Sequence, residues 1–155
     1  MRTFLRPIPL SLVCLGLITG CAQFSEHSTG LVNNQLTPCP SWPRCVSSVS
    51  AEAERRVEPF QLQPPFDARW DDAIATLAAM PRTRIVTRDK RYVHAEVTSP
   101  WGIYTDDLEM LLDRSRGRVD VRSSGRIGYY DFEVNRERVE ALREALAAKG
   151  LISRP

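Results

Sequence analysis

The segment Val119–Arg138 constrains the fold of this chain more than any other. It opens with apolar and polar residues in alternation through Ser124, the pattern of a β-strand with one buried face. It closes on Asn135, a residue type that caps helix N-termini, followed by an apolar stripe at helical spacing. Two glycines and many charged side chains lie between these patterns. The sequence therefore predicts a strand and a helix joined by a polar corner.

The preceding part of the chain supplies the remaining elements. Phe66–Met80 has helical spacing, with Asp67 as the expected N-cap and Pro81 as the stop. The last helix is expected over Arg136–Lys149. Strands are expected at 57–62, on a sheet edge, and at 84–88, 92–98, 104–112 and 118–124. This order predicts an α+β fold: a two-layer sandwich in which two helices cover one face of a curved antiparallel sheet of about four to five strands.

Short turns fix how these strands pair. A turn at 114–117 places Glu109 opposite Arg122, and the loop at 99–102 brings His94 near Glu109 and Glu96 near Asp107. The face against the helices is then apolar, with Val93, Ala95, Leu108, Met110, Val119 and Val121. The opposite face is polar, and we expect it to be open to water.

The N-terminus has the pattern of an export signal. Arg2 and Arg6 precede an apolar run, Leu10–Ile18, that is short for a membrane span, so residues 1–20 are predicted to be a signal peptide. The sequence Leu17-Ile18-Thr19-Gly20-Cys21 resembles a bacterial lipobox, which implies lipidation of Cys21. Ala22 then favours the periplasmic face of the outer membrane. The alternatives are an ordinary secretory signal and a buried apolar strand.

Processing changes the charge of the chain. The signal removes two of 21 basic residues and no acidic residue, so the mature chain carries 19 of each sign. This balance argues against nucleic-acid binding. Residues 21–38 lack periodicity and are predicted to be the lipidated N-terminus and a flexible tether, which leaves 39–155 as a single domain.

Two cysteines remain in the domain, Cys39 and Cys45. In an oxidising periplasm the expected outcome is a disulfide. A metal site and a redox pair are the alternatives, but no histidine lies nearby, and the spacing differs from that of redox pairs. We expect no bound metal and no cofactor, because phosphate-loop, dinucleotide and His-Glu-x-x-His motifs are missing from the sequence.

His94 and Glu96 share one strand face, near Asp106 and Asp107. A histidine with carboxylates can bind a divalent metal or act in acid–base catalysis. The alternative is a ladder of ion pairs with Arg122 and Arg126.

The polar corner is the other candidate site. Its predicted ligand-binding residues are Arg122, Arg126, Asp131, Asn135, Arg136 and Arg138. Arginines suit a phosphate or a carboxylate, and a helix N-terminus adds donors. The alternative is internal pairing with the neighbouring acids. Trp101, Tyr129 and Tyr130 are interpreted as residues that line a ligand cleft. The alternative is that they lie in the hydrophobic core or at its rim.

Four motifs in combination carry a family resemblance. They are Cys39-Pro-x-x-Pro-x-Cys45-Val-Ser-Ser, His94-Ala-Glu96, Asp106-Asp-Leu-Glu109 and Val121-Arg-Ser-x-Gly-Arg-x-Gly128-x-x-Asp131-x-x-x-Asn135-Arg-x-Arg138. Over about residues 38–147 the chain resembles the domain of unknown function 1499 family, whose pattern usually reads Ser where this chain has Gly125. The resemblance implies a single bacterial envelope or organellar domain, and it brings no activity, substrate or catalytic residue.

These observations favour a non-enzymatic envelope lipoprotein. It is expected to be held on the membrane through Cys21, and its polar corner to bind an envelope protein or a small anionic ligand. The alternatives are a small metal-assisted hydrolase that uses His94 and a carrier of apolar ligands.

Overall fold

The structure, a computed structural model, describes residues 28–153. The predicted signal peptide and the predicted lipidation of Cys21 lie outside these residues. The strands are β1 Leu31–Val32, β2 Gln35–Leu36, β3 Cys45–Ser47, β4 Phe60–Gln61, β5 Thr83–Arg88, β6 Tyr92–Thr98, β7 Thr105–Asp113 and β8 Arg118–Gly125. The helices are α1 Phe66–Ala78 and α2 Val134–Ala148, with a 3₁₀ turn η1 at Ala53–Arg55.

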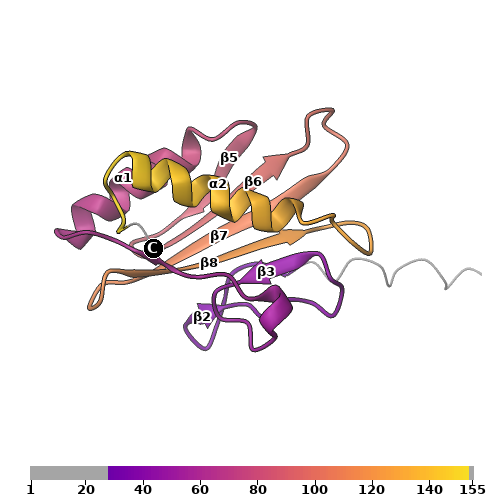
Figure 1. Cartoon of the computed structure of the whole chain (residues 1–155), viewed down its shortest axis with the longest axis horizontal. Helices are drawn as coiled ribbons and strands as arrows, with labels where there is room; N and C mark the ends of the chain where they lie inside the picture. Colours follow the sequence, from indigo (N-terminus) through magenta and orange to yellow (C-terminus); the bar gives the residue numbers. More distant parts are fainter. Residues whose placement is uncertain (1–27, 154–155) are drawn as a thin grey trace, which may run out of the picture.

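The main sheet is antiparallel and has six strands, in the order β3-β8-β7-β6-β5, with β4 also paired to β8. Both long helices cover one face of it (Figure 1). The α+β prediction is therefore confirmed, but the sheet has more strands than expected. The additional strand is β3, which pairs with the end of β8 that β4 leaves free. Three residues without alternation gave no strand signal there.

The predicted register is confirmed. His94 lies opposite Glu109, Glu96 opposite Asp107, and Glu109 opposite Arg122. The apolar set of strand residues lies against the helices, where Trp70, Leu77 and Leu142 complete the core. Alternation thus fixes which side chains face the helices.

The opposite face of the sheet is closed, contrary to the expectation that water covers it. Residues 28–38 form part of the domain, so the predicted tether is wrong for this segment. Strands β1 and β2 form a hairpin through Asn33 and Asn34, both at positive φ, a conformation that Asn tolerates in two-residue turns. Leu36 packs with Tyr92 and Leu111 in a second apolar cluster. This burial explains why the segment folds despite its lack of periodicity.

Both helix starts differ from the predictions. Helix α1 is preceded by Pro65, and Asp67 lies in its first turn rather than at the N-cap. Helix α2 starts one residue before Asn135, whose side chain is buried and used in tertiary contacts. Asp131 takes the capping role, because its carboxylate accepts the backbone N–H of Asn135.

Among residues 28–153, neither α1 nor α2 has the length and apolar character that a helix needs to span a bilayer.

Candidate functional site

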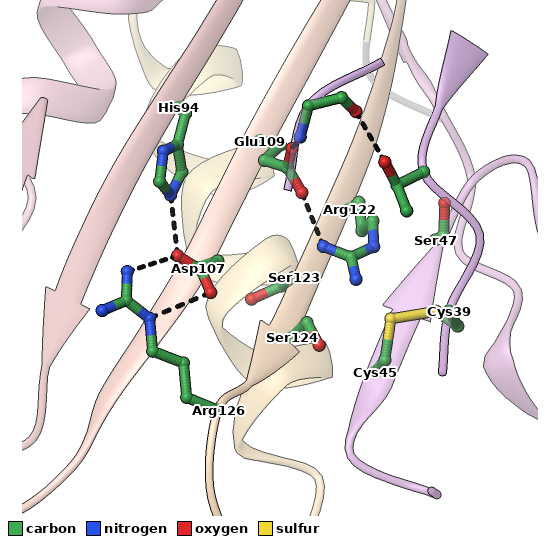
Figure 2. Close-up of polar contacts among 12 residues, drawn as sticks. Cys39, Cys45, Ser47, His94, Asp107, Glu109, Arg122, Ser123, Ser124 and Arg126 are labelled. Carbon is green, nitrogen blue, oxygen red and sulfur yellow. Dashed lines mark hydrogen bonds and ion pairs between the residues drawn. A yellow bond between two sulfur atoms is a disulfide. The ribbon is translucent and has the colours of Figure 1, made fainter. Parts of the chain in front are cut away.

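The closed face of the sheet contains a buried ion pair between β7 and β8. Arg122 Nη1 donates to Glu109 Oε2 at 2.6 Å, and the two side chains are 1% and 0% exposed (Figure 2). Glu109 Oε1 accepts the Tyr92 hydroxyl and the Gly30 backbone N–H, each at 2.6 Å. Burial raises the pKa of Tyr92, and the hydrogen bond to Glu109 raises it further, so the hydroxyl stays protonated as a donor. Both oxygens of Glu109 are therefore used within the fold.

A second ion-pair group surrounds His94. Its Nε2 lies 2.7 Å from Asp107 Oδ1, and the side chain of Arg126 reaches both oxygens of Asp107 (Figure 2). Arg126 also donates to Glu96 at 2.7 Å, and Arg84 binds the other Glu96 oxygen. The hydrogen bond from Arg126 lowers the pKa of Glu96 below its ordinary value of 4.5, and the bond to Asp107 raises the pKa of Arg126. Glu96 is thus held as a carboxylate.

This arrangement matches the predicted ladder of ion pairs better than a catalytic centre. His94 is 7% exposed, which leaves little of the ring for a substrate. Its carboxylate neighbour is already neutralised by Arg126. Among residues 28–153, no group of three or more His, Cys, Asp or Glu side chains is arranged to hold a metal ion. The pair can position a proton, but both of its side chains are buried.

Asp106 lies on the other side of the sheet from His94, because successive strand residues point to opposite faces. Its carboxylate accepts Arg138 Nη2 at 2.7 Å. Arg138 also donates to Ser123 and to Asn135, and Ser123 donates to Asn135 at 2.6 Å. This helix-side network joins α2 to β7 and β8.

The six predicted ligand-binding residues consequently lie in three places. Arg122 and Arg126 belong to the closed face, and Asp131, Asn135 and Arg138 belong to the helix-side network. Arg136 instead lines, with Asp131, a pocket of about 380 Å³ beside η1. That pocket contains four acidic and two basic side chains, Asp131, Glu52, Glu54, Glu133, Arg55 and Arg136. Internal pairing accounts for these arginines, and the acidic excess disfavours an anionic ligand.

The predicted disulfide is present between Cys39 and Cys45, with a Cα–Cα distance of 5.6 Å. It closes the loop that carries Arg44, a residue that sequence reasoning missed. Arg44 is buried, and its backbone oxygen accepts Gly125 N and Asn135 Nδ2. Its guanidinium donates to the Gly128 carbonyl, whereas Nε and Nη2 have no protein partner. The sequence carried no signal for this burial, because an arginine in a proline-containing loop is typical of the protein surface.

Apolar side chains are exposed on two loops at one end of the sheet. One loop joins β6 to β7, and the other joins β8 to α2. The loops are neighbours, since Thr98 pairs with Thr105 and Asp106 pairs with Gly125. Figure 1 shows both at the right-hand end of the sheet. We call their exposed apolar side chains the apolar end surface: Trp101, Ile103, Tyr104, Ile127, Tyr129, Tyr130 and Phe132.

The apolar end surface contains seven of the eleven large apolar side chains that are exposed among residues 28–153. Trp101 is 87% and Phe132 81% exposed, although sequence reasoning placed Trp101 and Tyr129 in a cleft or near the core. Phe132 has a φ of 55°, a strained conformation for an aromatic residue that the loop nevertheless holds. Exposed apolar patches of this kind are typical of interaction surfaces.

Comparisons with known proteins bear on identity at the level of a family. Neither the curated proteins nor the solved structures contain a match to this chain. A family model described as "Protein of unknown function (DUF1499)" matches residues 35–146, which include the disulfide loop, both ion-pair groups and most of α2. The chain therefore belongs to the DUF1499 family.

Proposed function

We propose that this protein is a lipid-anchored component of the bacterial envelope that acts by binding, not by catalysis, and that it binds through the apolar end surface. The observation that carries the proposal is a contrast within the domain. The charged candidates are occupied by one another, whereas within residues 28–153 the side chains of the apolar end surface stay exposed, with Trp42 in edge contact with Tyr129.

The energetics of the two regions differ accordingly. A ligand at Arg122 or Arg126 would have to replace hydrogen bonds of 2.6–2.7 Å to carboxylates that are already desolvated. A partner at Trp101 or Phe132 would instead remove apolar surface from water, which is favourable at about 25 cal/mol per Å². Binding at the end surface therefore needs no rearrangement of the domain.

Support for the anchor comes from the N-terminal sequence. A positive n-region, a short apolar run and small residues before Cys21 together form the pattern that precedes lipidated cysteines. Several acyl chains on one residue hold a protein at a membrane far more firmly than a single chain does. The anchor would keep the domain at a bilayer surface.

Replacement of Cys21 by Ser tests the anchor. We expect wild-type protein in the membrane fraction, with a diacylglyceryl mass on the peptide that begins at Cys21, and the C21S protein in the soluble fraction. A Cys39→Ser/Cys45→Ser variant is the matched control, because it removes two other cysteines and should remain in the membrane fraction. An unmodified Cys21 peptide, or an unchanged distribution of C21S, refutes the anchor.

The contact between His94 and Asp107 favours one rival function, metal-assisted hydrolysis. Calorimetric titration with Zn²⁺ separates the two. Under our proposal, wild type and His94→Ala bind Zn²⁺ equally weakly. A tight site that is lost in H94A would overturn the non-catalytic proposal and support the rival.

A further inference from the structure

We infer that the apolar end surface enters the headgroup region of the same bilayer that carries the lipid anchor, so that the sheet stands with this end on the membrane. The inference rests on the proposed lipidation of Cys21 and goes beyond it by assigning an orientation and an occupant to the end surface. The occupant is the lipid bilayer itself.

The N-terminal hairpin is oriented so that its open end faces the apolar end surface. Its tip lies at the opposite end of the sheet, where Asn34 accepts a hydrogen bond from Arg91 in the β5–β6 turn. Its open end lies beside the middle of β7, where Gly30 N–H donates to Glu109. After the hairpin, the chain continues to Trp42, whose ring packs edge-on against Tyr129 of the apolar end surface. The two ring centroids are 5.2 Å apart. The chain before Leu31 therefore also joins the hairpin at its open end, on the side of the apolar end surface.

The length of chain between Gly30 and Cys21 suffices for the anchor to reach this plane. Thr105, at the end of the sheet, lies four positions before Glu109, about 14 Å along β7. Cys21 lies nine positions before Gly30, and this length of chain can span up to about 30 Å. A lipidated Cys21 can therefore lie in a membrane that touches the loops, and the bilayer is the one apolar phase that the anchor itself keeps within reach.

The side chains of the end surface suit an interface between lipid and water. Trp101, Tyr104 and Tyr129 each combine an apolar ring with a polar group, the property that enriches Trp and Tyr at membrane interfaces. Ile127 and Phe132 add purely apolar area. These residues protrude from two short loops rather than line a groove, which suits shallow insertion better than the grasp of a peptide.

The charges near the end surface do not select an anionic membrane. Asp131 and Glu133 are acidic, whereas Arg82 and Arg126 are basic and lie at the same end of the sheet. With the signs balanced, insertion depends on apolar area and not on attraction to lipid phosphate. We therefore expect it in zwitterionic vesicles and at high salt.

Tryptophan quenching by brominated lipid tests the inference. The lipidated, full-length mature protein is purified from membranes and reconstituted into phosphatidylcholine vesicles with brominated acyl chains. Trp101 should be quenched, and Trp101→Phe should remove most of the quenching, because Trp70 is buried in the core and Trp42 is half-buried. Trp101 is on the surface, so W101F leaves the fold intact.

A matched reporter at the opposite end serves as the control. Arg116 is exposed in the β7–β8 turn, and Arg116→Trp in the W101F background moves the exposed tryptophan away from the membrane. This variant should not regain quenching, and addition of anionic phosphatidylglycerol or salt should not change the wild-type signal. Equal quenching at both ends, or quenching that requires anionic lipid, overturns the inference.

Three further outcomes separate the inference from the proposed function. If the protein floats with the vesicles but Trp101 stays unquenched, the anchor holds and the inference is wrong. Shielding of Trp101 in native membranes but not in lipid vesicles likewise overturns it in favour of a protein partner. If the Cys21 peptide carries no lipid and the protein does not float, the proposed anchor fails, and the inference fails with it.

Discussion

Individual side chains show how this domain uses its charges. Arg122 and Glu109 place opposite charges between the sheet and the β1–β2 hairpin, where neither side chain reaches water. Removing both ions from water costs several kcal/mol each, and close contact returns this only when the other hydrogen bonds of the pair are made. Glu109 meets that condition, since Tyr92 and Gly30 use its second oxygen, whereas Arg122 Nε is buried without a hydrogen-bond partner. The main role of the pair is therefore to hold the hairpin in place on the sheet, rather than to add net stability.

Loss of one member of this pair should be costly. Arg122→Met leaves the Glu109 carboxylate buried without a counter-ion, so the free energy of unfolding in urea should fall by about 3–5 kcal/mol. The double variant R122M/E109Q removes both charges but keeps an oxygen for Tyr92 and Gly30, and it should recover more than half of the loss. Additive losses in the double variant would show that the two charges are not coupled.

Glu96 gives a pH-dependent prediction. Its pKa in the folded protein is lowered, chiefly by Arg126, so its contribution to stability is complete above the ordinary value of 4.5 and is lost as the pH falls through the lowered value. Glu96→Gln should therefore be less stable than wild type near pH 7, and the two should converge in acid. Thermal unfolding across the pH range measures this difference. A difference that stays constant with pH would contradict the assignment.

Among the elements, the long strands and the edge strand β4 could be predicted, whereas β3 and the β1–β2 hairpin could not. Alternation over β6, β7 and β8 fixed both their register and the apolar face that the helices cover. β3 and the β1–β2 hairpin have only two or three residues per strand, too few for a period. Without the hairpin, the polar face appeared to be open to water. This omission made Arg122 appear to be part of a site available to a ligand.

The hairpin can be tested as a structural element. Leu36 is 2% exposed in the second apolar cluster, whereas Leu31, its cross-strand partner, is 38% exposed. Leu36→Ala should lower the free energy of unfolding by about 2–5 kcal/mol. Leu31→Ala is the matched control and should cost less than about 1 kcal/mol. Equal small losses would mean that the hairpin is not part of the cooperative unit, as a flexible tether would predict.

The whole molecule is polarised along its strands. One end has the apolar end surface, and the other has the charged turns at 89–91 and 114–117. A pocket at this second end is lined by Trp70 and by six charged side chains, Asp67, Asp71, Arg88, Asp89, Lys90 and Arg114. Alternation explains which face of a strand is buried. It does not predict which end of the sheet is apolar and which end is charged. That property depends on the loops, and the sequence showed their aromatics without showing that they gather at one end.

This polarity predicts opposite responses to two proteases at a membrane. Chymotrypsin cleaves after exposed aromatics such as Trp101 and Phe132, whereas trypsin cleaves after Arg114 and Arg116 at the charged end. When the lipidated protein sits on vesicles, chymotryptic cleavage in the two apolar loops should slow several-fold, because the bilayer covers them. Tryptic cleavage in the β7–β8 turn should keep its rate, which controls for a general effect of the vesicles, and detergent release should restore the chymotryptic rate. Mass spectrometry of the fragments follows both rates in one sample. Protection at the charged turn, with the apolar loops still cleaved, would mean that the domain stands on the membrane the other way up.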